Sequence, residues 1–178
     1  MRVVAGIHRG RPLRAPKGEQ TRPTSDRVRE AIFSIVAEAV QDAVVLDLFA
    51  GSGALGIEAL SRGAAAAVFV DTAPAAITTV KENLAALGLE AAVVRMPALR
   101  ALACTPVAGR EYDLVFIDPP YRMASALGTE LSAALPPLLA ADARVVVESD
   151  RREPLALDLP LLRERQYGDT LIRIHGAQ

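Results

Sequence analysis

The sequence has few of the residues that build disulfide frameworks or metal clusters. It holds one cysteine, Cys104, and two histidines, His8 and His175, among 178 residues. A single cysteine excludes an internal disulfide framework, and two distant histidines do not have the spacing of a metal site. We therefore expect no metal in this protein, and we interpret Cys104 as a small, partly buried hydrophobic residue.

Long hydrophobic runs are also missing. No apolar stretch is long enough to cross a bilayer, and the start of the chain, Met1-Arg-Val-Val-Ala-Gly, lacks the apolar core of a signal peptide. This pattern predicts a cytoplasmic protein that does not contact a membrane. A hydrophobic fraction of 51% over 178 residues is typical of one compact α/β domain with a large core. We expect one domain over residues 1–178, with a basic extension over 1–23 and a core over 24–178.

Positive and negative charges nearly balance, but they are unevenly distributed. The net charge is −1, yet residues 1–30 hold eight Lys or Arg and only three Asp or Glu, so this segment carries +5 and the remainder −6. An isolated run of like charges is usually explained as a segment exposed to solvent. Binding to nucleic-acid phosphates also requires such a basic segment. The motifs of the core favour the second interpretation, and the predicted nucleic-acid contacts are Arg9, Arg11, Arg22, Arg27 and Arg29.

A glycine loop follows the apolar run that begins at Val44. Gly51, Gly53 and Gly56 have the spacing of the dinucleotide fingerprint, in which glycines allow a tight turn and a close approach to a ligand. The amides at the start of the next helix favour a carboxylate or a phosphate. Asp71 ends the following apolar run, where an acid can accept hydrogen bonds from ribose hydroxyls. These features predict a cofactor that contains a nucleoside.

Asp47 indicates which cofactor this is. It lies in the first predicted strand, just before the glycines, where a carboxylate attracts an ammonium group and repels a pyrophosphate. S-adenosyl-L-methionine has such an ammonium group, a carboxylate for the loop amides and a ribose for Asp71, and is the predicted cofactor. The alternative, a dinucleotide-binding oxidoreductase or regulatory module, leaves Asp47 without a role. The predicted cofactor contacts here are Asp47, Phe49, Ala50, Gly51, Ser52, Gly53 and Asp71.

A second motif, Asp118-Pro-Pro-Tyr121, directly follows the apolar run 112–117. The prolines stiffen the chain and have no N–H, so the Asp118 carboxylate and the Pro119 carbonyl can face outward as two fixed acceptors. Such a pair fits an amino group with two hydrogens, and Tyr121 offers a flat face for stacking a planar base. A plain strand-ending turn explains these four residues alone, but it does not explain the upstream loop. The predicted catalytic residues are Asp118, Pro119, Pro120 and Tyr121.

The two motifs together resemble those of class I methyltransferases, and Asp-Pro-Pro-Tyr resembles the motif of enzymes that methylate exocyclic amino nitrogens. Three further segments, 22–30, 50–63 and 167–170, make essentially the whole chain similar to the bacterial 16S ribosomal RNA guanine-N2 methyltransferase family. The resemblance implies methyl transfer from S-adenosyl-L-methionine to N2 of one guanine in 16S ribosomal RNA, within a small ribosomal subunit or an assembly intermediate.

An adenine-N6 DNA methyltransferase is the nearer alternative, because such enzymes can share the Asp-Pro-Pro-Tyr motif. A stand-alone enzyme of that kind usually needs a further segment to read bases in a groove. With 178 residues, this chain has no spare length for that segment. The guanine-N2 interpretation is therefore preferred.

The chain departs from the family pattern after the third predicted strand. Residues 94–98 lack the Asp or Asn with which many relatives bind the adenine amino group, and Pro97 has no N–H to donate. If adenine is held here, the Ala98 N–H and apolar contacts from Met96 or Ala98 must hold it. Ala98 completes the predicted cofactor site.

Alternating apolar runs and helical patterns predict a Rossmann-like class I methyltransferase sheet, mostly parallel, with helices on both faces. The apolar stripe of Val28, Ile32, Ile35 and Val36 predicts an N-terminal helix capped by Thr24 or Ser25, with Arg27 and Arg29 on other faces. The predicted strands cover residues 44–48, 67–71, 91–95, 112–117 and 143–148, and further helices cover 53–62, 74–87 and 124–140.

Two hairpins complete the prediction. Residues 163–167 and 170–175, joined through Gly168-Asp169, predict an antiparallel hairpin at the sheet edge, and residues 2–15 predict a short hairpin that presents Arg9 and Arg11. Ligands of such sheets bind beyond the carboxyl ends of the strands. Asp47, Asp71 and Asp118 lie at or near such ends, so we expect them to meet in one crevice.

Overall fold

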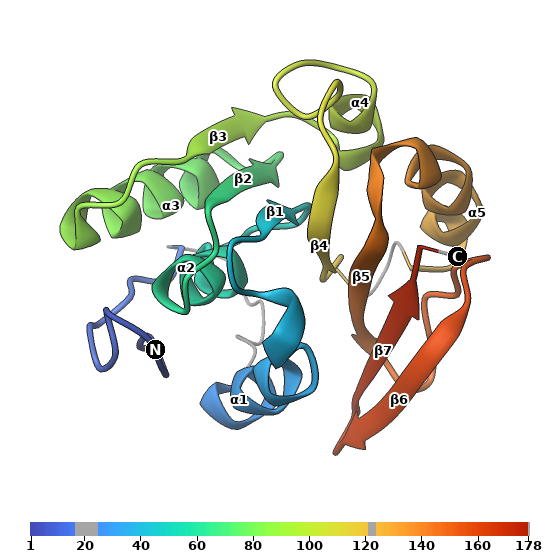
Figure 1. Ribbon diagram of the computed structural model, residues 1–178, viewed down its shortest axis with the longest axis horizontal. Coiled ribbons are helices and arrows are strands. Elements are labelled where there is room, and N and C mark those ends of the chain that lie inside the picture. The colour runs from blue at the N-terminus through green and yellow to red at the C-terminus, as the bar shows by residue number, and fades with distance from the viewer. Residues whose placement is uncertain (17–24, 121–123, 178) are drawn as a thin grey trace.

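Within residues 1–16, 25–120 and 124–177, which the computed structural model describes, seven strands form one sheet (Figure 1). Their order across the sheet is β3-β2-β1-β4-β5-β7-β6. The side chains are described except those of residues 124–126. The strands are β1 (Val44–Asp47), β2 (Ala66–Asp71), β3 (Ala92–Arg95), β4 (Tyr112–Ile117), β5 (Leu139–Asp150), β6 (Leu161–Tyr167) and β7 (Thr170–Gly176).

The direction of the strands confirms the predicted mixed sheet. Strands β1 to β5 pair in parallel, whereas β7 pairs antiparallel with both β5 and β6. The chain proceeds from β1 outward to β3 and then returns to place β4 on the other side of β1. The topological switch point, where open α/β sheets bind ligands, therefore lies between β1 and β4.

Helices cover both faces of the sheet, because alternate strand residues are apolar on both sides. Phe69 and Phe116 pack into one core with α1 (Asp26–Ile35), α2 (Ala54–Ser61) and α3 (Pro74–Leu87). Val68 and Val115 point to the opposite face, where α4 (Ala98–Leu102) and α5 (Ala124–Ala134) form the second core. Figure 1 shows α2 and α3 together on one side and α4 and α5 together on the other.

After residues 1–16, the main differences between the predicted elements and the structure lie at three places. The helix predicted over 124–140 ends at Ala134, because Pro136 and Pro137 cannot continue an α-helix and instead begin the 3-10 turn η3 (Pro136–Leu138). Strand β5 then begins at Leu139, earlier than predicted. Helix α4 was not predicted, and with five residues it is too short to show a helical period.

The start of the chain forms a turn rather than a regular hairpin. The bridge between Arg2 and Pro12 is isolated, and Val3 both donates to the Arg11 carbonyl at 2.9 Å and accepts from Gly10 N at 2.8 Å. We call residues 1–16 the arm; it lies beside α2 (Figure 1). The predicted cap of α1 is confirmed at Ser25, whose side chain accepts from Val28 N, and the short turn η1 (Ala37–Ala39) follows α1.

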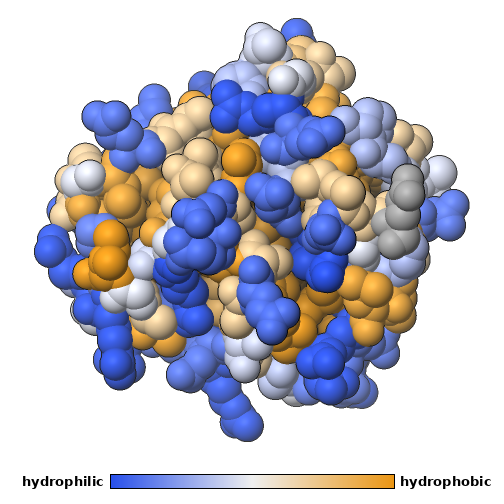
Figure 2. All heavy atoms as spheres, viewed as in Figure 1, coloured by the Kyte–Doolittle hydropathy of each residue, from blue (hydrophilic) through white to orange (hydrophobic). Residues whose placement is uncertain are grey.

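The surface carries hydrophilic side chains interspersed with hydrophobic ones on the face shown in Figure 2. Among the described residues, no helix combines the length and apolar character needed to cross a bilayer. The same residues contain no group of three or more His, Cys, Asp or Glu arranged to hold a metal ion.

Candidate active site

The three predicted acids lie on neighbouring strands at the switch point. Asp47 ends β1 and is level with Phe69 of β2 and Phe116 of β4. Asp71 therefore lies two residues beyond that level on one side of β1, and Asp118 lies two residues beyond it on the other. The structure thus brings the predicted acids together at the carboxyl ends of the central strands, as expected from the sequence.

The glycine loop between β1 and α2 is held by the neighbouring strand. Ala50 N donates to the Val70 carbonyl at 3.0 Å, and Gly51 N donates to Asp71 Oδ2 at 2.9 Å. Gly51 has a φ of +52°, and a Cβ placed on it would meet no atom within 4 Å. The backbone is therefore open to a ligand at Gly51, which is the close approach that a cofactor loop requires.

Both carboxylate oxygens of Asp71 accept hydrogen bonds from backbone N–H groups. Besides Gly51 N, its Oδ1 accepts from Ala73 N at 2.9 Å, which fixes the start of α3. A carboxylate oxygen can accept more than one hydrogen bond, so the half-buried Asp71 retains acceptor capacity for ribose hydroxyls. This contact stays a prediction, and the residue's structural role is to hold the loop.

Asp47 lies beneath the loop with only 2% of its surface exposed. Its Oδ2 accepts from Gly56 N, in the first turn of α2, at 3.1 Å. The N-cap residue of α2, Gly53, has no side chain to do this, so Asp47 supplies the acceptor that a Ser or Asp cap would supply. A contact between Asp47 and an ammonium group stays a prediction.

The environment of Asp47 favours its neutral form. Burial is the largest cause and raises the pKa of Asp47 from 3.8 to about 7. The hydrogen bond from Gly56 N opposes this shift, while the nearby Asp71 carboxylate adds to it. An acid that titrates near neutrality inside the predicted cofactor site can ionise when a cation enters.

Replacing Asp47 with asparagine is expected to make the protein more stable at high pH. The pKa of Asp47 is raised on folding, so its favourable contribution is complete below about pH 4 and is lost as the pH rises to about 7. The asparagine oxygen keeps the bond from Gly56 N and does not ionise. The variant's advantage in free energy of unfolding should grow by on the order of 2 kcal/mol between about pH 5 and about pH 8. Urea unfolding at both pH values measures this, and a constant difference would contradict it.

The third glycine of the fingerprint has a packing explanation. A Cβ on Gly56 would overlap the Phe69 ring, so only glycine allows α2 to pack this closely on β2. Gly53, at φ +77°, faces the interior near Val80 and Ile57. The Gly-x-Gly-x-x-Gly spacing therefore reflects how the helix packs on the sheet, and it does not by itself indicate a dinucleotide.

The predicted acceptor motif begins directly after β4. Asp118 is partly exposed, Pro119 is buried and Pro120 is exposed. Leu48 N of the glycine loop donates to the Phe116 carbonyl at 3.0 Å, which joins the two motifs across the switch point. Tyr121 lies outside the described residues, so its stacking role stays a prediction.

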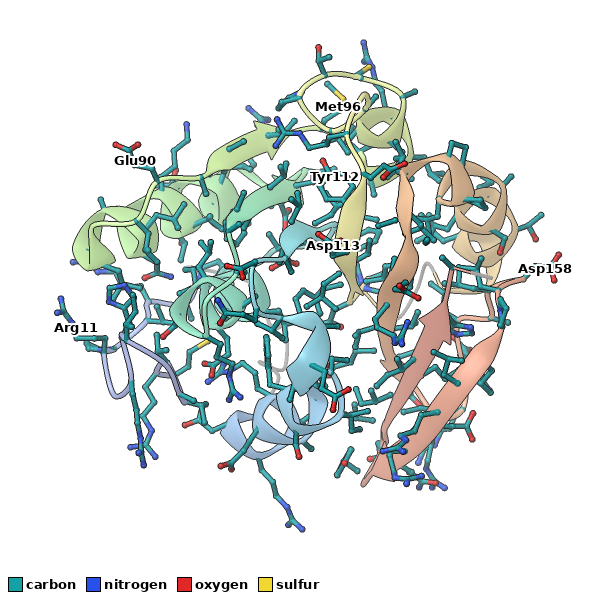
Figure 3. All side chains as sticks on the ribbon, viewed as in Figure 1. Arg11, Glu90, Met96, Tyr112, Asp113 and Asp158 are labelled. Atoms are coloured by element: carbon teal, nitrogen blue, oxygen red, sulfur yellow. The ribbon has the colours of Figure 1, made fainter. Side chains whose placement is uncertain are left out.

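The end of β3 forms the third side of the predicted cofactor site. Met96 N donates to the Asp71 carbonyl at 3.0 Å, and Ala98, 6% exposed, begins α4 after Pro97. Figure 3 shows Met96 where β3 leads into α4. The first N–H groups of a helix have no acceptor within it, which is compatible with the predicted adenine contact from Ala98.

One predicted RNA contact must be corrected. Arg29 is fully buried, with Nη2 bonded to Asp26 Oδ1 at 2.8 Å and to the Arg2 carbonyl, and it lies 3.9 Å from Glu58 Oε2. It therefore fixes the arm instead of facing a ligand. Arg9, Arg11 and Arg27 are exposed as predicted, and Arg22 lies outside the described residues. Figure 3 shows Arg11 at the outer edge, where Nη2 donates to the Ala86 carbonyl at 2.9 Å.

Sequence reasoning missed Glu58, which anchors the arm to α2. Its buried carboxylate accepts from Val4 N at 2.7 Å, from Ala5 N at 2.9 Å and from Arg62 Nε at 2.7 Å. Ser61, one turn later, donates to the Ala5 carbonyl at 2.6 Å. The available signal was an acid within the mainly apolar helix 54–61, since a buried acid requires partners.

Comparison with known proteins shows the family to which this chain belongs. The family model described as conserved hypothetical protein 95 matches residues 1–176. Ribosomal RNA small subunit methyltransferase D of Escherichia coli K12 is 36% identical over 181 residues, which covers 100% of this chain and 90% of the relative. YlbH of Bacillus subtilis 168, a candidate rRNA methyltransferase, is 42% identical over 182 residues and 98% of each chain.

The fold has close matches among solved structures. The structure of a hypothetical protein from Thermus thermophilus, TTHA0928, superposes with a TM-score of 0.85 at 34% identity, over 99% of each chain. The resemblance inferred from the sequence motifs is thereby confirmed. The chain belongs to the family of the ribosomal RNA small subunit methyltransferase D proteins, described in the matching model as conserved hypothetical protein 95.

Proposed function

We propose that this protein transfers the methyl group of S-adenosyl-L-methionine to the exocyclic N2 of a guanine in 16S ribosomal RNA. The observation that carries the proposal is the position of Asp118-Pro119 at the end of β4, directly across the switch point from the glycine loop. Family membership supports ribosomal RNA as the substrate. The choice of guanine N2 depends on the Asp-Pro-Pro-Tyr motif and the family resemblance.

The cofactor would be held at the carboxyl ends of two neighbouring strands, β1 and β2. Asp71 would accept from the ribose hydroxyls, the open backbone at Gly51 would approach the cofactor, and Asp47 would face its ammonium group. The fit is chemical: two acids and a loop of amides match a ligand with hydroxyls, a cation and a carboxylate. When bound, S-adenosyl-L-methionine supplies an electrophilic methyl group on its sulfonium.

The protein's own residues would act mainly by positioning the guanine. The Asp118 carboxylate and the Pro119 carbonyl would accept the two amino hydrogens, which turns the lone pair of N2 out of conjugation and toward the methyl group. Tyr121 would stack the base and help to exclude water. Asp118 is the nearest acceptor for the proton that N2 loses, so it can take that proton or pass it to solvent.

The experiment that tests the proposal uses cofactor labelled on its methyl group. It is offered with small ribosomal subunits from cells without this activity, with free 16S ribosomal RNA and with duplex DNA, and the products are digested to nucleosides. Label in N2-methylguanosine from ribosomal material alone is the expected result. Label in N6-methyladenine from DNA would instead identify a DNA methyltransferase, and no label would overturn the proposed transfer.

The exposed cations of the arm are proposed to contact RNA phosphates. Reversing Arg9 and Arg11 to glutamate should weaken RNA binding and reduce the slope of log affinity against log salt by about two, one for each lost contact. Cofactor affinity should not change. The matched control reverses Arg163 and Arg165, which are exposed on β6 at the opposite edge of the sheet. An equal effect of both double variants on RNA binding would show that only net charge matters.

A further inference from the structure

Asn83, a residue without a role in the proposed chemistry, connects the arm to the glycine loop. It lies on α3 and is 2% exposed. Its Oδ1 accepts from Arg14 N at 2.8 Å, and its Nδ2 donates both to the Arg14 carbonyl at 3.0 Å and to the Ser52 carbonyl at 2.9 Å. A buried side-chain amide that satisfies three backbone groups on two other segments is held in one orientation.

The bond to Ser52 fixes a peptide of the cofactor loop. The Ser52 carbonyl and the Gly53 N–H belong to one planar peptide and point in opposite directions. Asn83 holds the carbonyl, while Gly53 N donates to the Ala50 carbonyl at 2.6 Å. Asp71 fixes the Ala50–Gly51 peptide, two peptide units earlier, through Gly51 N. The side chains of Asp71 and Asn83 therefore both hold the loop in its conformation, and Asn83 also binds the arm.

The arm contacts the loop where Asn83 holds it. Leu13 N donates to the Met1 carbonyl at 3.0 Å, and Ser52 Oγ lies 3.4 Å from the Met1 sulfur. Arg14 follows directly and is bonded to Asn83 through both of its backbone groups. The exposed Arg9 and Arg11 belong to the same short segment. A ligand that fixes the conformation of the arm therefore also affects the Ser52 peptide, through Asn83.

We propose that Asn83 is a positioning residue that couples the arm to the glycine loop, so that RNA on the arm and cofactor on the loop strengthen each other's binding. This inference rests on the proposed function. RNA bound to the arm holds the Arg14 backbone, and thereby the Ser52 peptide, in the orientation that receives the cofactor. The effect is reciprocal, because a coupling free energy between two sites acts equally on both ligands.

The test measures binding of S-adenosylhomocysteine, which cannot transfer a methyl group, by calorimetry. Its affinity is compared in the absence and presence of saturating 16S ribosomal RNA, and RNA affinity is measured with and without it. The wild-type protein should bind each ligand at least about fivefold more tightly in the presence of the other. Asn83→Ala should reduce this factor to less than about twofold while leaving kcat at saturation of both ligands within about threefold.

Two variants make the test specific. Arg14→Pro removes one of the two hydrogen bonds between Arg14 and Asn83, the one that the Arg14 N–H donates, so it weakens the same connection from the arm and should also lower the coupling factor. Glu82→Gln is the matched control, because it removes the exposed ion pair between Glu82 and Arg14 without touching Asn83 or Ser52, and it should keep the wild-type factor. A purely structural role of Asn83 would lower stability and leave the coupling factor unchanged.

The outcomes for the wild-type protein separate this inference from the proposed function. If both ligands bind but neither affects the other, the inference is overturned and the proposed function stands, whatever the variants do. If S-adenosylhomocysteine does not bind with or without RNA, the proposed function fails and the inference fails with it. Coupling that survives in Asn83→Ala would also overturn the inference.

Discussion

Replacing Asp118 with alanine is expected to reduce methyl transfer by about 100- to 10,000-fold, in the range found for a positioned acid or base. The variant loses the carboxylate that would accept an amino hydrogen of the base, while the Pro119 carbonyl remains. Asp118 follows β4, whereas the predicted ribose and ammonium contacts come from β1 and β2. Affinity for S-adenosyl-L-methionine should therefore stay within about threefold. Initial rates with ribosomal RNA and calorimetry of the cofactor measure the two effects.

Two further variants define this prediction. Asp118→Asn keeps one acceptor oxygen without its charge and should retain more activity than the alanine variant. Asp158→Ala, which changes an exposed acid at the right-hand edge of the molecule in Figure 3, should behave as wild type. Equal loss of cofactor affinity and of transfer in Asp118→Ala would place this residue in the cofactor site instead.

Replacing Glu58 with alanine is expected to lower the free energy of unfolding by about 3–5 kcal/mol, the usual cost of removing one partner of a buried ion pair. The change leaves the fully buried Arg29 with only one nearby carboxylate, that of Asp26, and it removes the acceptor of two arm N–H groups, those of Val4 and Ala5. Small domains have only about 5–15 kcal/mol of stability, so much of it would be lost. Urea unfolding gives the value.

The control for Glu58 is another glutamate that binds an arginine. Glu82→Ala breaks an exposed pair with Arg14 and should cost less than about 1 kcal/mol. Glu58→Gln keeps one acceptor oxygen for an arm N–H, so its loss in free energy of unfolding should lie between those of Glu58→Ala and Glu82→Ala. If Glu58→Ala were no more destabilising than Glu82→Ala, the arm would not depend on this carboxylate.

The sequence predicted the sheet well because its signals are local. Each buried strand is a short apolar run, and the turn at Gly168 gives the hairpin of β6 and β7 directly. The convergence of Asp47, Asp71 and Asp118 followed from a general rule of parallel sheets. Element ends were less accurate where proline intervened, as at Pro136.

The remaining features depend on contacts between distant parts of the chain. The bonds from Glu58 to Val4 and from Asn83 to Arg14 span 54 and 69 residues, and no periodicity reports such pairs. The sequence alone did not show whether Arg29 is exposed or buried, because this depends on which other segment of the chain packs against its face of the helix. Asp47 looked like a ligand contact, and its bond to Gly56 N became visible only when the packing of α2 on β1 was known.

All eight residues of α2 are buried, although a helix on the outside of a sheet normally keeps one face in water. The arm covers that face here, and Glu58 and Ser61 are the polar residues that receive it. The arm and this helix face should therefore be inherited together. Among methyltransferases with the same glycine loop, a chain without the arm should carry polar side chains at the positions of this helix face that are apolar here. The pattern of α2 alone should then indicate which sequences possess an arm.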